Sequence, residues 1–515
     1  METNLGPVLR LVGLVLAGCG LAVGSVSFGH ADEDARVPEM PTVRTFLDDY
    51  QNIRDFLLAA EPESRAYYRF LTLSPMASPS FHFSEQSFYH IAVAKLLNSL
   101  SWETKLICPE IVPGSAGFVL AIDLRELRWT AGNQWLEILS QYPYGLKFEH
   151  ASDQTLRQAA ADVQELSQAE MPLLRADWFI YALSQPPLYP QLLQLPLELT
   201  DLEQRLGIQI EENITRGEIA RAGFSQSSMS PQNRLIERHE GKYGAVWIGY
   251  EFLPRRGKGD LVRFPLGPRS DNNPFNRHAF QADGQSILFQ LPNGLFGYYL
   301  VDQHGRRVDH VSNTNLAYDR TAISGTPTMV TGLSCLHCHH QGLQTGFRDE
   351  VRAAGVLVGD GLDRLQQVYW PAENMQKLAE RDQQPFLAAD RQIVARYSQP
   401  SVNLVAAGQP TDAVTYLPEP IGFCVTRYLR DLGPAEIAAE LGLSDIESIR
   451  SQIQLKPSLR HLGLGTLLQE QAGKIKRHRW EAIDGTSLFQ DVAVELGLGT
   501  PIQSGSTHKS RSIRP

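Results

Sequence analysis

The run Cys335-Leu336-His337-Cys338-His339 has the pattern C-x-x-C-H, by which haem is attached covalently to a polypeptide. No other stretch restricts the possible folds as much. Two thiols at this spacing can each bond to a haem vinyl group, and the adjoining imidazole can then bind the iron. The chain has only five Cys and 14 His in 515 residues, so composition alone would produce this run on the order of once in a thousand such chains. The sequence therefore predicts one covalent haem c on Cys335 and Cys338, with His339 as an iron ligand.

A zinc site is the alternative interpretation of the same residues. Cys335, Cys338 and either His339 or His340 have the spacing of a zinc knuckle. A closed zinc site needs further ligands at comparable spacing, and the sequence contains no other C-x-x-C. We therefore favour haem.

Residues 1–31 have the layout of a secretory signal peptide, with Arg10 before an apolar stretch and small residues before the acidic Asp32. The Gly-rich composition argues against a transmembrane anchor. The residues ending at Cys19 resemble a bacterial lipobox, which would make Cys19 lipid-modified, although the following residues stay apolar. We expect export to the periplasm or cell envelope, with membrane attachment only through a lipid on Cys19. This compartment agrees with the haem motif, because bacterial haem c is attached outside the cytoplasm.

The composition excludes some partners. A formal net charge of -10 argues against nucleic acid, because phosphate binding needs clustered cations. After the signal peptide, no apolar run reaches membrane-spanning length. Cys108 and Cys424 are the thiols left over, and the sequence leaves open whether they form a disulfide or stay free.

The period of the apolar residues changes along the chain and predicts an α+β multidomain protein. We expect a helix-rich N-terminal domain at 37–235, an antiparallel β-rich domain at 236–327 and an all-α, cytochrome c-like haem module at 328–400. A helical C-terminal region at 401–503 and a disordered basic tail at 504–515 complete the predicted organisation.

Within the N-terminal region, helical spacing of apolar residues predicts helices at 42–60, 63–73, 85–100 and 155–185. The exception is 118–122, a short apolar run whose β-branched and aromatic residues predict a buried strand.

Between 236 and 327 the period becomes two, which predicts strands at 245–248, 261–264, 287–289 and 298–301. Dipeptides typical of hairpin turns fall between or after them: Asp283-Gly284, Asn293-Gly294 and His304-Gly305. The natural assembly of such strands is an antiparallel meander.

Later segments are again helical. The haem motif is expected to open a helix, and Pro371 to begin another that runs to about Asp382. Residues 434–444 are similar to the first helix and turn of a helix-turn-helix, but the acidic residues that follow are unsuited to DNA. We interpret this stretch as an ordinary helical hairpin.

A six-coordinate haem needs a second axial ligand opposite His339. Met375 lies 36 residues downstream of that histidine and is the only Met beyond the motif. We therefore predict Met375 as the second ligand, with Met329, a histidine or an open iron position as alternatives.

The chain resembles an uncharacterised family of large, exported bacterial proteins that carry one cytochrome c-like module. The resemblance covers most of residues 60–500 and implies a multidomain architecture with covalent haem, but no known substrate. Besides the haem motif, it rests on the segments 95–102, 122–125, 233–239, 291–295, 332–334, 349–352, 476–481 and 496–499.

Arg234 and Arg238 are candidates for binding the haem propionates. Four residues apart, they would lie on one face of a helix and could each donate two hydrogen bonds to a carboxylate. His239 is a further candidate for the second iron ligand. The alternative is a solvated helix in which Glu237 and Glu240 form ion pairs with the arginines.

Three functions are compatible with these features. The first is electron transfer between partner proteins whose identity the sequence does not reveal. The second is a haem enzyme, such as a peroxidase or a substrate oxidase, which needs an open iron position and nearby acid–base groups. The third is a haem-based sensor. We favour the electron carrier.

Overall fold

The computed structural model describes residues 44–502 apart from the gaps 78–80, 82–84, 228, 255–256, 258, 345, 355, 399–418, 444 and 470–472. The predicted signal peptide, the residue Cys19 and the predicted basic tail lie outside the described residues. Helices and several antiparallel sheets occur along the described chain, which confirms the predicted α+β class. None of the described helices is both long and apolar enough to cross a membrane.

The first sheet has four strands in the order β2-β3-β1-β5. Its strands are β1 (Tyr68–Thr72), β2 (Glu110–Ile111), β3 (Val119–Asp123) and β5 (Leu173–Arg175). Strand β3 confirms the strand predicted at 118–122. The helix predicted at 63–73 is wrong, because β1 is a central strand whose successive residues Phe70 and Leu71 are buried on opposite faces.

Eight helices of the described chain belong to the first half of the fold. They are α1 (Phe46–Ala59), α2 (Glu85–Ser99), α3 (Gln134–Ser140), α4 (Gln154–Ser167), α5 (Ala176–Leu183), α6 (Leu188–Leu192), α7 (Leu199–Leu206) and α8 (Ile210–Arg216). α1 and α2 confirm the helices predicted at 42–60 and 85–100. The single helix predicted at 155–185 is wrong, because α4 ends at the left-handed residue Gln168 and β5 separates it from α5.

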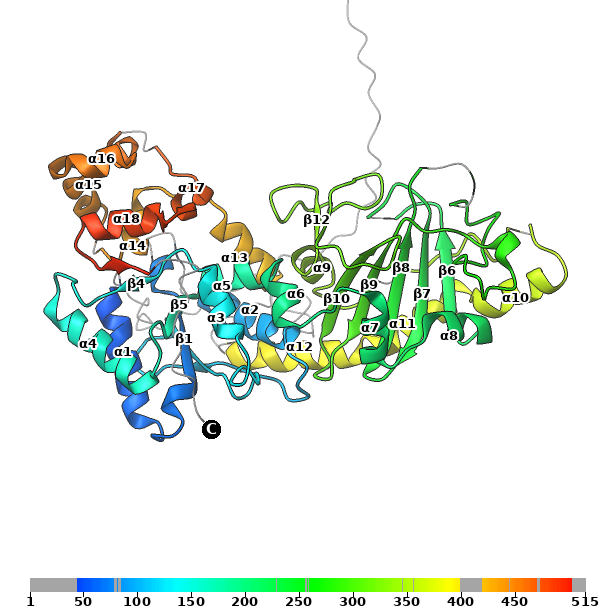
Figure 1. The fold of residues 1–515 in the computed structure, drawn as a ribbon, viewed down its shortest axis with the longest axis horizontal. Coiled ribbons are helices and arrows are strands. Elements are labelled where there is room, and N and C mark those ends of the chain that lie inside the picture. The colour runs from blue at the N-terminus through cyan, green and yellow to red at the C-terminus, as the bar shows by residue number, and fades with distance from the viewer. Residues whose placement is uncertain are drawn as a thin grey trace, which may run out of the picture. The chain divides into compact units, whose positions relative to one another are not determined.

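The second sheet has five strands in the order β10-β9-β8-β7-β6, which run side by side in Figure 1. They are β6 (Ala220–Phe224), β7 (Arg234–Gly241), β8 (Gly244–Glu251), β9 (Gly284–Gln290) and β10 (Phe296–Asp302). The predicted meander is confirmed by the antiparallel pairing of β8, β9 and β10. The strand predicted at 261–264 is wrong, because the Asp260 carboxylate accepts hydrogen bonds from the amides of Val262 and Arg263 and holds a turn.

Strand β7 corrects another prediction, because residues 233–239 had the features of an exposed helix. In the structure they form an inner strand between β6 and β8. Successive side chains therefore point to opposite faces, with Arg234, Ile236 and Arg238 on one and Glu237 and His239 on the other. The domain boundary predicted at residue 235 falls inside this strand.

The remaining helices are α9 (Leu333–Cys338), α10 (Asp360–Val368), α11 (Ala372–Asp382), α12 (Gln384–Tyr397), α13 (Pro420–Tyr428), α14 (Pro434–Glu440), α15 (Ile446–Leu455), α16 (Pro457–His461), α17 (Arg477–Glu481) and α18 (Leu488–Glu495). α11 confirms the helix predicted from Pro371 to Asp382, and α14 packs on α15 as the predicted hairpin. Three small two-stranded sheets pair β4 (Leu146–Lys147) with β15 (Thr500–Pro501), β11 (His310–Val311) with β12 (Met329–Val330), and β13 (Ile483–Asp484) with β14 (Thr486–Ser487). One continuous cluster of buried apolar side chains joins both large sheets and the helices around them.

Candidate functional site

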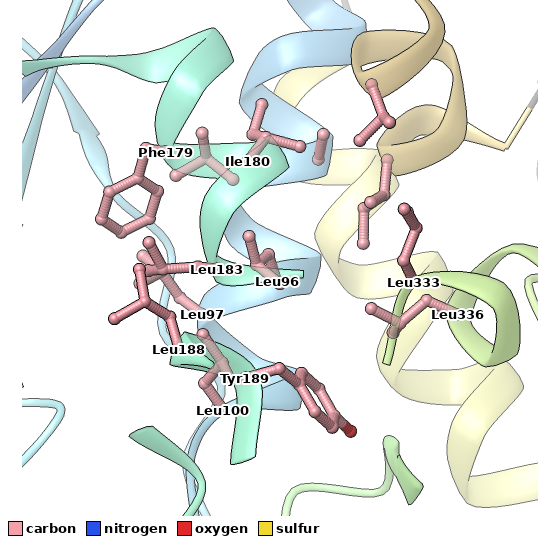
Figure 2. Packing of buried hydrophobic residues seen from close by; sticks show 14 of the residues in the cluster. Leu96, Leu97, Leu100, Phe179, Ile180, Leu183, Leu188, Tyr189, Leu333 and Leu336 are labelled. Carbon is pink, nitrogen blue, oxygen red and sulfur yellow. The ribbon is translucent and has the colours of Figure 1, made fainter. Parts of the chain in front are cut away.

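The C-x-x-C-H run lies on α9, a short helix that begins directly after Gly332. The backbone at Gly332 has a φ of +87°, and a Cβ atom there would lie 2.7 Å from Cγ of Tyr189 and still closer to the carbonyl oxygen of Ser184. Only glycine allows this turn and this close approach. From there, the buried Leu333 and Leu336 enter the apolar cluster formed with α2, α5 and α6, as Figure 2 shows.

The other side of α9 borders a cavity of about 670 Å³, within the range of about 300–1,000 Å³ typical of ligand and cofactor sites. Cys335, Cys338 and His339 all line it. Its floor is one face of the five-stranded sheet, which carries Phe224, Arg234, Ile236, Trp247, Gly249, Ser286, Leu288, Tyr298 and Leu300. Residues 318–321, Met329, Leu343 and Phe347 enclose it further. The structure thus brings the predicted attachment run and Arg234 to one cavity.

The imidazole of His339 is held in one orientation beside the cavity. Its Nδ1 lies 3.1 Å from the carbonyl oxygen of Gly342, which can only accept a hydrogen bond. The proton is therefore on Nδ1, and Nε2 carries the lone pair. The ring stacks on Tyr298 with centroids 5.9 Å apart, and burial lowers the pKa of His339 to about 4. The imidazole is consequently neutral and fixed in orientation.

The two thiols are unlike those of a disulfide oxidoreductase. Burial raises the pKa of Cys335 to about 12 and also raises the pKa of Cys338, so both are protonated at neutral pH. Reactive C-x-x-C cysteines have a lowered pKa instead.

A contact with α13 holds the middle of the motif. Nδ1 of His337 lies 3.5 Å from the Glu419 carboxylate, and the proximity of that carboxylate raises the pKa of His337. Glu419 also accepts hydrogen bonds from the amides of Ile421 and Gly422 at the start of α13. Residues 335–339 are thus held by the apolar contacts of Leu336 and by the contact of His337 with Glu419.

Four buried polar atoms of cavity-lining residues have no hydrogen-bond partner within the part of the chain that the structure describes. They are Nε of Arg234, Nε1 of Trp247, Oδ2 of Asp319 and Nδ1 of His337. Buried polar groups are nearly always hydrogen-bonded, so these atoms can pair with a group or with water in the cavity. The N–H groups of Arg234 and Trp247 suit acceptors such as carboxylate oxygens.

Arg234 reaches the cavity because Gly249 leaves room for it. A Cβ atom at Gly249 would lie 2.6 Å from Nη2 of Arg234. That nitrogen donates to Oγ of Ser286 at 3.0 Å and lies 3.1 Å from Glu251. The guanidinium is therefore held in one orientation, with Nε unpaired.

Arg238 does not line the cavity. Its Nε donates to Asp382 at 2.6 Å, and Nη2 donates to Glu240 at 2.7 Å. The expectation that it joins Arg234 assumed a helix. In a strand, residues four apart are separated by about 13 Å instead of about 6 Å.

The predicted second ligands are also placed differently. Met375 is completely buried on α11 and is not among the residues that line the cavity. α11 directs Met375 and Ala379, one turn apart, into the core. His239 lies on the opposite face of β7, with Nε2 2.8 Å from Glu237. Met229 and Met329 are the methionines that line the cavity.

The floor of the site was missed by sequence reasoning. Trp247, Leu288 and Tyr298 lie in strands that were predicted, but their common face follows only from the register. For Arg234 and Ile236 no signal of a strand was available, because apolar and polar residues do not alternate between 234 and 240. Asp319 lies in an irregular segment and carries no such signal.

The zinc interpretation needs a cluster of ligands. Within the described residues there is no group of three or more His, Cys, Asp or Glu side chains placed to hold a metal ion. Cys108 and Cys424 are free thiols, so the structure contains no disulfide between them.

Comparisons with protein-family models, with curated proteins and with solved structures give no significant match to this chain.

Proposed function

We propose that this protein carries one covalently attached haem on Cys335 and Cys338, with His339 on the iron, and that it transfers electrons to and from partner proteins. The observation that supports this most is the cavity of about 670 Å³ that adjoins all three residues of the attachment run. In this proposal the chain is exported, through the signal peptide predicted at 1–31.

The residues around the cavity fit a haem. Ile236, Trp247, Leu288 and Tyr298 provide apolar surface for a porphyrin. Nε of Arg234 and Nε1 of Trp247 provide two unpaired donors for propionates. The haem supplies reversible one-electron chemistry, and the chain excludes water, orients His339 and neutralises charge.

A haem enzyme or sensor is the second candidate, and Asp319 favours it. Its Oδ2 is buried without a hydrogen-bond partner in the described structure, while Oδ1 is held by the amide and hydroxyl of Thr321. A carboxylate fixed in this way could exchange protons with a ligand on the iron. Such a role requires an open iron position, whereas an electron carrier needs both axial positions filled.

Covalent attachment is tested by haem staining of denatured protein. Wild type expressed with a haem-attachment system should keep its colour after denaturation, and its intact mass should include one haem on a chain that starts at Asp32 or at a lipid-modified Cys19. Replacing both Cys335 and Cys338 by Ala should abolish the stain. Cys108→Ala, which removes a thiol that does not line the cavity, should keep it. Loss of colour from denatured wild type would refute the proposal.

A further inference from the structure

The cavity contains two thioether side chains, and both come from before the attachment run in sequence. Met229 lies between β6 and β7, and Met329 lies on β12, six residues before Cys335. A thioether is a soft, neutral ligand that complements an imidazole on haem iron. The second axial ligand can therefore be sought among these two residues.

Met329 has the surroundings of a fixed ligand. It is only 4 % exposed and packs against Leu300 and Ala317. Its backbone pairs with Val311 across the two-stranded sheet of β11 and β12. A ligand held by packing and backbone hydrogen bonds needs little reorganisation to bind a metal.

The connection from Met329 to α9 is equally fixed. The amide of Val330 donates to Oγ of Ser334 at 3.1 Å, and the amide of Thr331 donates to the carbonyl oxygen of Asp309 at 3.0 Å. The chain then turns at Gly332, where φ is positive. This turn lets Met329 and the Cys335 segment line the same cavity although they are close in sequence.

Met229 is less suited to the role. Its sulfur lies 2.8 Å from Nη1 of Arg234, so a lone pair of the thioether faces a cation. The residue is also only partly buried. Binding iron would require Met229 to leave the guanidinium.

We propose that Met329 is the second axial ligand of the haem, an inference that rests on the proposed covalent attachment. The ligand then comes from upstream of the C-x-x-C-H run. Since a thioether favours ferrous iron, this ligation gives the site a higher reduction potential than two imidazoles would.

The test compares holoprotein variants by haem stain, optical spectrum, reduction potential and carbon monoxide binding of the ferrous form. Met329→Ala should bind carbon monoxide, lose the sulfur-to-iron charge-transfer band and have a lower potential. Met329→Leu, which keeps the side-chain volume, should show the same three changes. The proposal can therefore still be tested if the alanine variant misfolds. Met375→Ala should behave as wild type, and Met229→Ala should keep the charge-transfer band and bind no carbon monoxide.

Opening of the iron by Met229→Ala or Met375→Ala, but not by the Met329 variants, would overturn the assignment. So would carbon monoxide binding by wild type, because its iron would then lack a sixth protein ligand. All these variants keep both thiols and should stain for covalent haem. Wild type without stain would instead contradict the proposed function.

Discussion

Gly332 and Gly325 have nearly the same φ angle but very different surroundings. Both have positive φ, +87° and +85°. A Cβ atom at Gly325 would meet nothing within 4 Å, whereas at Gly332 it would collide with Tyr189 and Ser184. Comparing alanine substitutions at the two sites therefore separates the cost of backbone strain from the cost of steric overlap.

We expect Gly332→Ala to lower the free energy of unfolding by about 3 kcal/mol or more. Backbone strain at positive φ contributes about 1–3 kcal/mol, and overpacking adds a similar amount. Gly325→Ala should show the strain alone. Urea denaturation of both variants measures the difference, and equal losses would show that the close approach to Tyr189 is not tight.

At the scale of elements, α9 is short but has two distinct sides. Leu333 and Leu336 are buried in the common core, and Cys335 and Cys338 border the cavity. β7 is divided similarly: Arg234 faces the cavity, while Glu237 is buried on the other face with Arg221 at 2.5 Å. These elements position the site because their reverse sides are fixed in the core.

Leu336→Ala tests this anchoring of α9. Removing a buried leucine side chain should cost about 2–5 kcal/mol of unfolding free energy, and the variant should take up less haem. Leu455→Ala is the control, because Leu455 is 76 % exposed on α15 and should change stability by about 0.5 kcal/mol or less. Thermal or chemical denaturation and the haem-to-protein ratio provide the measurements. Similar values for both variants would mean that α9 is not held by its apolar side.

At the scale of the whole molecule, a buried ion cluster joins segments far apart in sequence. Glu440 of α14 lies 2.5 Å from Arg175 at the end of β5 and 2.7 Å from Arg477 of α17. Trp480 also donates to this carboxylate at 2.8 Å. Burial alone would raise the pKa of Glu440, but the two arginines outweigh it and lower the pKa from 4.5 to about 2.

This shift predicts a specific loss of stability in acid. Because the pKa of Glu440 is lower in the folded state than in the unfolded state, its contribution is complete above about pH 4.5 and is lost as the pH falls towards 2. The loss amounts to about 3 kcal/mol at 1.36 kcal/mol per pKa unit. Glu440→Gln should be less stable at pH 7 by about 3–5 kcal/mol and should lack this part of the pH dependence.

The control is Glu447→Gln, which removes an exposed carboxylate that pairs with Arg450 on α15. It should leave both the stability and its pH profile within about 0.5 kcal/mol of wild type. Urea denaturation between pH 2 and 7 compares the three proteins. An unchanged acid profile in Glu440→Gln would show that the cluster does not couple protonation to folding.

Features that depend on neighbours in sequence were predictable from sequence alone. Cys335, Cys338 and His339 were identified by their spacing. In the structure their local geometry also comes from neighbours in sequence: α9 ends at Cys338, and His339 is held by the carbonyl oxygen of Gly342, three residues further on. The start of α11 after Pro371 and the strand β3 follow from local stereochemistry in the same way. Proline geometry and a short β-branched run act on the chain without help from distant residues.

Which side chains meet at the cavity was decided only by the tertiary structure. Arg234 and Arg238 are alike in sequence, yet only Arg234 lines the cavity, because β7 is a strand and Asp382 from α11 engages Arg238. Met375 is apolar at a position that α11 turns into the core, whereas Met329 lines the cavity from β12, just before the turn at Gly332. These outcomes depend on contacts between segments that are distant in sequence or joined by a turn, and such contacts leave no periodic pattern in the chain.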